Sequence, residues 1–251
     1  MTRSLVTGPT SHPVTLSDVK NNLRITHYDD DGHLYGLIQM ATARAESYCN
    51  RALLTQTWNL YLDEFPAADY ISLPLGQLQS VTHVKYTDSN DDQSTFSSSY
   101  YSVDTAKEPG RIILDYQQSW PTDTLATNNP IEIQFVCGYY IGTTWHHTTS
   151  KSSGDYVEPT TRYGNGYVYQ AGGNGTTDDT EPTWPRTVDG TVVDNDITWT
   201  CVGRSLPWPI RQAIILMVAD AYRQRETDVF AVSHKKLNTV ESLLFPYKVF
   251  V

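Results

Sequence analysis

The chain has 251 residues, of which 39% are hydrophobic, and a formal net charge of -10 at pH 7. This length and apolar content suffice for one large domain or two small ones, and they exclude a disordered chain or a fibrous repeat. No apolar run approaches the roughly 20 residues of a membrane helix, and the amino terminus lacks a secretory signal, so we expect a cytosolic product with no membrane partner.

Two helices are predicted in the first fifth of the chain. Thr15 to Asp18 has the pattern of a capping box and opens a short helix. Asp29 to Asp31 are predicted to cap a longer helix over residues 31–52. Its apolar residues recur with the i, i+3, i+4 spacing of one buried stripe.

The hydrophobic period changes to 2 directly after this helix. Trp58, Leu60 and Leu62 share one face of a predicted strand. Further strands are predicted near residues 70–73, 80–86, 100–103, 111–115 and 131–137. Residues 88–92 are predicted to be the turn between two of these strands.

From residue 143 to residue 203 the composition shifts to Gly, Thr, Asp, Tyr and Trp, with frequent turn signals and no helical period. We therefore predict an inserted small β-domain over 143–203, carried by a body of residues 1–142 and 204–251. The expected fold class is α+β, with about four helices, an antiparallel β portion and an all-β insertion.

The C-terminal part is predicted to contain two more helices. Pro209 suits the first position of a helix over residues 209–226, and Asn238 to Glu241 cap a final short helix that stops before Pro246. The aromatic end of the chain would expose about 150 Å² or more per ring in water. It must therefore fold back or insert into a neighbour.

Catalytic signatures are absent from the sequence. There is no Gly-x-Ser-x-Gly elbow, phosphate loop, His-Glu-x-x-His or Cys-x-x-Cys pair. His146 and His147 would point to opposite faces of a strand, and Asp88 to Asp92 lacks the glycine and distal glutamate of a calcium loop. The three scattered cysteines suit buried, reduced thiols. We expect no enzyme, no cofactor and no metal.

Four aromatic residues of the insertion are candidates for contact with a glycan or a partner protein: Trp145, Tyr167, Tyr169 and Trp184. Exposed rings of this kind stack on sugars, and the pattern is similar to chitin-binding modules and to small β-modules of phage structural proteins. The same rings can form the whole core of a small β-domain, which is the interpretation we favour. The alternative function is thus a carbohydrate-binding or adhesion protein.

Residues 41–66, where the long helix runs into a strand almost without a loop, resemble the head-tail connector family of tailed bacteriophages, also called head-completion or adaptor proteins. The resemblance extends to residues 73–74, 79–81, 84–88 and the helix entered through Pro209. It covers roughly residues 14–139 and 207–247. The insertion is a departure from the family pattern.

The resemblance implies a non-enzymatic virion protein of the neck, made in the host cytoplasm. It implies a ring, dodecameric, beneath the portal protein, which extends the DNA channel and offers a docking platform to the next neck or tail protein. DNA would pass without sequence-specific binding, because the acidic body does not attract phosphates. The expected portal-binding arm comprises Lys235, Lys236, Leu243, Leu244, Phe245, Tyr247 and Phe250.

Overall fold

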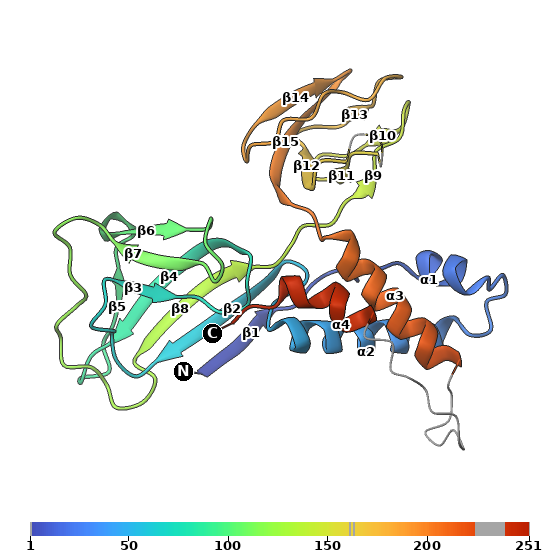
Figure 1. The fold of residues 1–251 in the computed structure, drawn as a ribbon. Coiled ribbons are helices and arrows are strands. Elements are labelled where there is room, and N and C mark those ends of the chain that lie inside the picture. Colours follow the sequence, from blue (N-terminus) through green and yellow to red (C-terminus); the bar gives the residue numbers. More distant parts are fainter. Residues whose placement is uncertain (1, 161, 163, 224–238, 251) are drawn as a thin grey trace, which may run out of the picture. The chain divides into compact units, whose positions relative to one another are not determined.

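The computed structural model describes residues 2–160, 162, 164–223 and 239–250 (Figure 1). The chain divides into two compact units: unit 1 comprises Met1–Gly138 and Ala213–Val251, and unit 2 comprises Tyr139–Gln212. Helices and mainly antiparallel sheets are both present, so the predicted α+β class is confirmed.

Helix α1 (Leu16–Leu23) begins at the predicted capping box. The amide of Asp18 donates to Oγ1 of Thr15 at 3.1 Å, and the amide of Thr15 donates to Oδ2 of Asp18 at 2.9 Å. The two residues thus satisfy two amides that the first turn of a helix leaves free, which fixes where α1 starts.

Helix α2 (Asp31–Cys49) is shorter than the predicted span, because Asn50 adopts the left-handed conformation with φ of 50° and ends it. The predicted cap position at its start is confirmed, but no side-chain capping bond forms there. Asp30 occupies the N-cap position without a side-chain cap bond, and its Oδ2 accepts a hydrogen bond from the Tyr222 hydroxyl at 2.5 Å. The predicted buried stripe is confirmed by five residues: Leu34, Ile38, Ala41, Ala45 and Cys49.

Unit 1 contains a five-stranded antiparallel sheet, the main sheet, in the order β1-β2-β8-β4-β5. Its strands are β1 (Thr2–Thr7), β2 (Gln56–Leu62), β4 (Leu78–Thr87), β5 (Gln93–Phe96) and β8 (Ile131–Cys137). A second sheet contains β3 (Tyr70–Ser72), β6 (Tyr101–Asp104) and β7 (Arg111–Leu114) in the order β3-β7-β6, and a 3-10 turn, η1 (Ser98–Tyr100), precedes β6.

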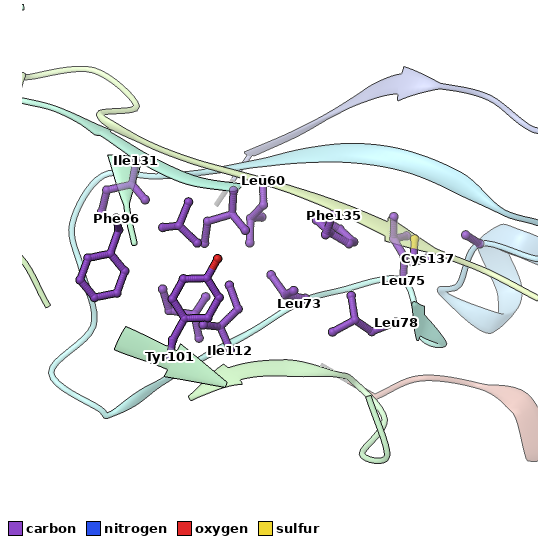
Figure 2. Close-up of a cluster of buried hydrophobic side chains, with 14 residues drawn as sticks. Leu60, Leu73, Leu75, Leu78, Phe96, Tyr101, Ile112, Ile131, Phe135 and Cys137 are labelled. Atoms are coloured by element: carbon purple, nitrogen blue, oxygen red, sulfur yellow. The ribbon is translucent and has the colours of Figure 1, made fainter. Parts of the chain in front are cut away.

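The core of the β portion lies between these two sheets (Figure 2). Leu60 and Phe135 of the main sheet face Tyr101 and Ile112 of the second sheet, and all four side chains are buried. Cys137 closes the cluster at the end nearer the helices. Only one face of β2 and β8 is buried in this cluster, which explains why apolar and polar residues alternate along both strands.

The C-terminal part of the chain forms α3 (Trp208–Arg223), α4 (Thr239–Leu244) and a 3-10 turn, η2 (Phe245–Tyr247). The predicted helix over 209–226 is confirmed as far as Arg223, and its last three residues lie outside the described part of the chain. Asn238, the predicted cap of the final helix, lies outside it as well.

Unit 2 is a β-structure with strands β9 (Thr143–Thr144), β10 (Ser150–Lys151), β11 (Tyr156–Glu158), β12 (Tyr167–Ala171), β13 (Gly175–Thr176), β14 (Thr191–Asp194) and β15 (Ile197–Arg204). Its larger sheet has the order β14-β15-β12-β11-β9, and β10 pairs with β13. One face of the larger sheet contributes to a core that contains three tryptophans: Trp145, Trp184 and Trp199.

Candidate functional site

The C-terminal segment, residues 239–250, folds back onto the end of α2. The amide of Val249 donates to the carbonyl oxygen of Cys49 at 2.8 Å, and Nδ2 of Asn50 donates to the carbonyl oxygen of Val249 at 3.4 Å. The Cys49 thiol lies 3.7 Å from the carbonyl oxygen of Leu244. The sequence predicts that this apolar end either folds back or inserts into a neighbour. In the structure it folds back onto its own chain.

Arg51 holds the C-terminal segment in place through hydrogen bonds. Its side chain is only 2% exposed, and Nε donates to the carbonyl oxygen of Tyr247 at 2.8 Å. The same guanidinium donates to both carboxylate oxygens of Glu108, at 2.5 and 3.4 Å. A planar guanidinium can serve a carboxylate and a carbonyl together, so one residue connects α2, the loop before β7 and the C-terminal segment.

Two aromatic rings remain outside after this docking. Phe245 is 59% exposed and Phe250 is 69% exposed, and their centroids lie 6.3 Å apart in an edge-to-face arrangement. Nζ of Lys248 lies 5.3 Å from the Tyr48 ring and 5.8 Å from the Phe250 ring. We call Tyr48, Phe245, Lys248 and Phe250 the C-terminal patch. Exposed aromatics beside a cation are typical of protein–protein contacts.

The structure divides the predicted portal-binding residues into three groups. Phe245 and Phe250 are exposed, whereas Leu243 and Tyr247 are half-buried. Leu244 is only 2% exposed, because it packs against the end of α2, so its side chain serves the fold of unit 1. Lys235 and Lys236 lie outside the described residues.

The four candidate residues of unit 2 do not offer exposed ring faces. Trp145, Tyr169 and Trp184 are at most 6% exposed, and Tyr167 is half-buried. Tyr169 and Trp184 pack with centroids 4.4 Å apart. A ring that stacks on a sugar needs one free face, so this burial supports the interpretation that the aromatics are the core.

Two carboxylates hold the indoles of this core in place. Asp194, only 3% exposed, accepts hydrogen bonds from Nε1 of Trp145 at 2.8 Å and from Nε1 of Trp199 at 2.9 Å. Its other oxygen accepts from the amide of Asp178 at 2.8 Å. Nε1 of Trp184 donates to Glu181 at 2.8 Å. Buried indoles need such acceptors, and the sequence pattern gave no signal for this pairing.

The remaining candidates for chemistry are structural. In the hairpin turn between β4 and β5, Oδ1 of Asp88 accepts from the amides of Asn90 and Asp92 at 2.8 and 3.0 Å, and these bonds hold the pKa of Asp88 below its usual value. The turn prediction is confirmed.

Within the described ranges, no group of three His, Cys, Asp or Glu residues is arranged to hold a metal ion. None of the described helices is long and apolar enough to span a bilayer.

The three thiols are free and buried, as the sequence predicts. Burial raises the pKa of Cys49 to about 11 and that of Cys137 to about 12, and it raises the pKa of Cys201 as well. The reactive form of a thiol is the thiolate, which none of the three buried side chains offers near neutral pH.

We therefore expect the folded protein to react with a thiol reagent such as Ellman's reagent very slowly at pH 8, because its thiols are both protonated and covered. In denaturant all three thiols should react within the mixing time. Absorbance at a fixed reagent concentration measures the rate in both conditions. Rapid reaction of even one thiol in the folded protein would contradict the burial described above.

The fold is thus that of an α+β protein with an inserted β-unit, and the described residues contain no cluster suited to a metal ion. Residues 13–109 match the family described as phage gp6-like head-tail connector proteins. The match spans α1, α2 and strands β2 to β6, and it confirms the resemblance to head-tail connectors that the sequence predicts. No curated protein sequence matches the chain.

Solved structures with a similar fold come from gene transfer agent (GTA) particles. A chain in the neck of the empty GTA particle with C6 symmetry has a TM-score of 0.62 and 15% identity, and the alignment covers 100% of this chain and 97% of that one. A chain in the neck of the native GTA particle with C12 symmetry gives 0.60 and 16%, with the same coverage. At such identity the likeness establishes a shared fold, which here includes unit 2.

Proposed function

We propose that the protein is a structural component of a virion neck, where copies form a ring beneath the portal protein. The observation that carries the proposal is the connector match over residues 13–109, together with the fold shared along the whole chain with chains of GTA necks. The C6 and C12 symmetries of those necks support a ring of twelve copies. The ring extends the DNA channel and offers a docking platform to the next neck or tail protein.

Charge supports passage of DNA without adhesion. Residues 63–129, which belong to the β portion of unit 1, carry 10 acidic and 3 basic side chains. A surface of this sign repels phosphates, so the β portion is the part of the ring that we place nearest the DNA. No enzymatic step is required of the protein in this role.

The purified full-length chain mixed with the portal protein of its own particle tests the ring directly. Side views in negative stain should show a second ring stacked beneath the portal, and class averages of that ring should report twelve-fold symmetry. Mixtures that contain only single copies of the chain beside free portals would contradict the proposal.

The C-terminal patch supplies the contact with the portal. Replacing both rings with aspartate, as Phe245→Asp with Phe250→Asp, should leave the fold intact, because both side chains are exposed. Binding to the portal should weaken by about 100-fold or more, since central aromatic anchors contribute about 2 kcal/mol or more each to an interface. Surface plasmon resonance with immobilised portal measures the change.

A matched control exists in Tyr116, which is 89% exposed in the loop after β7. Tyr116→Asp changes an aromatic side chain of similar size, away from the C-terminal patch, and should bind the portal as the unmodified protein does. Equal portal binding by the double variant and the control would show that the C-terminal patch does not contact the portal.

A further inference from the structure

The main sheet of unit 1 ends in two open edges (Figure 1). Strand β1 is outermost on one side and pairs with β2, and β5 is outermost on the other side and pairs with β4. Within the described part of the chain, neither outer edge pairs with a further strand. The free N–H and C=O groups of such an edge are a template for another strand.

Both edges lack most of the features that usually prevent pairing. All six side chains of β1 are exposed, including Leu5 at 51% and Val6 at 48%, and Arg3 is its one charged residue. The register shifts at Val6, which leaves a regular run of four residues, Thr2 to Leu5. Strand β5 also has four residues, with neither charge nor proline. Edge strands in monomers are commonly blunted by lysine or proline.

The other sheets lack two edges of this length. The three-stranded sheet ends in β3, which has three residues, and the larger sheet of unit 2 ends in β9, which has two. Strands β10 and β13 have two residues each. Among the described strands, β1 and β5 are therefore the pair of opposite edges best able to join one copy to another.

We propose that neighbouring copies in the ring join their main sheets edge to edge, with β1 of one copy paired to β5 of the next. The inference rests on the proposed ring and adds the subunit contact that builds it. A contact between two different edges is heterologous, so it repeats around a ring, whereas β1 paired with β1 would close after two copies. Leu5 and Val6 gain cover from the neighbouring strand.

Four successive antiparallel pairings separate β1 from β5, so the two strands have the same polarity in the order of the sheet, while the sheet twist of about 20–25° per strand turns their axes apart. The junction continues this polarity from copy to copy, so β1 runs parallel to β5 of the next copy. A parallel junction places Arg3 near Asp91 and Asp92, which directly precede β5. The charges at the junction are therefore complementary.

Cysteine cross-linking tests the junction, because the three native thiols are buried and a reagent meets only the introduced one. Ser4→Cys and Thr95→Cys are made separately in exposed positions of β1 and β5. The two full-length variants are mixed with portal, imaged to establish that rings are present, and treated with a short bismaleimide. A denaturing gel should show a product that contains one copy of each variant, and neither variant alone should give it.

The matched control mixes Ser4→Cys with Ser153→Cys, an exposed serine of unit 2. Rings without a Ser4–Thr95 product above this control would overturn the junction and leave the proposed neck function standing. A product from Ser4→Cys alone would replace the junction with a two-fold contact. A sample without rings would overturn the proposed ring and the junction together.

A second set of cysteine variants tests whether β1 and β5 pair in parallel. Thr2→Cys should cross-link more strongly with Gln93→Cys, at the start of β5, than with Ser97→Cys, just beyond its end. The opposite order would mean an antiparallel junction and would overturn the geometry proposed here.

Discussion

Asp194→Ala should unfold unit 2 at a much lower denaturant concentration than the unmodified protein needs. The carboxylate is 3% exposed and accepts hydrogen bonds from two indoles and one backbone amide. Its removal leaves two buried indole N–H groups without a partner, each at a cost of about 1–3 kcal/mol, and also frees the amide of Asp178, an exposed residue. We expect a total loss of about 3–5 kcal/mol from the free energy of unfolding of unit 2, a range typical of broken buried polar groups.

Hydrogen exchange followed by mass spectrometry can measure this loss separately for each unit. Peptides from residues 139–212 should lose protection, whereas peptides of the main sheet should keep theirs. Asp196→Ala is the matched control, because Asp196 is an exposed aspartate two residues further along the chain. Indistinguishable exchange in the two variants would show that Asp194 does not hold the core of unit 2.

Arg51→Ala should release the C-terminal segment and destabilise unit 1. The guanidinium is bonded to Glu108 and to the carbonyl oxygen of Tyr247, and hydrogen bonds with a charged partner contribute about 1.5–3 kcal/mol each. Since Glu108 is 38% exposed and can be hydrated afterwards, we expect a loss of about 3 kcal/mol rather than the sum. Arg51→Lys should recover only part of it, because an ammonium lacks the planar fork.

Urea unfolding gives the stability change of Arg51→Ala, and hydrogen exchange of residues 239–250 reports release of the segment. Arg44→Ala is the control, since Arg44 is exposed on α2, the helix that ends just before Arg51. If the segment in Arg51→Ala remained as protected as in Arg44→Ala, the main-chain bonds from Val249 would be sufficient to hold it. Release should also weaken portal binding, because the C-terminal patch would lose its fixed geometry.

The sequence predicted those elements whose side chains repeat with a clear period. The stripe of α2, the alternation in β8 and the capping box of α1 all depend on local pattern, and each is present in the structure. The strands β1 and β5 were missed. Every side chain of β1 is exposed and β5 is short and polar, so neither leaves an alternation that could be read from the sequence.

The candidate sites were less predictable, because they depend on contacts between distant residues. The aromatic end of the chain signalled that it needed cover, but not that Arg51, nearly two hundred residues earlier, would hold it. Leu244 and Phe245 are adjacent and similarly apolar, yet one is buried and the other exposed. The tryptophans of the insertion suggested a core, whereas the carboxylate of Asp194 that accepts from two of them gave no local signal.

The buried thiols make the chain insensitive to the redox state of its surroundings. A move from reducing to oxidising surroundings lets accessible thiols form mixed disulfides or sulfenic acids. Cys49, Cys137 and Cys201 are all shielded from solvent, so this change of redox environment leaves the chain chemically unaltered. The neck proposed above would then keep the same thiol chemistry in reducing and in oxidising surroundings.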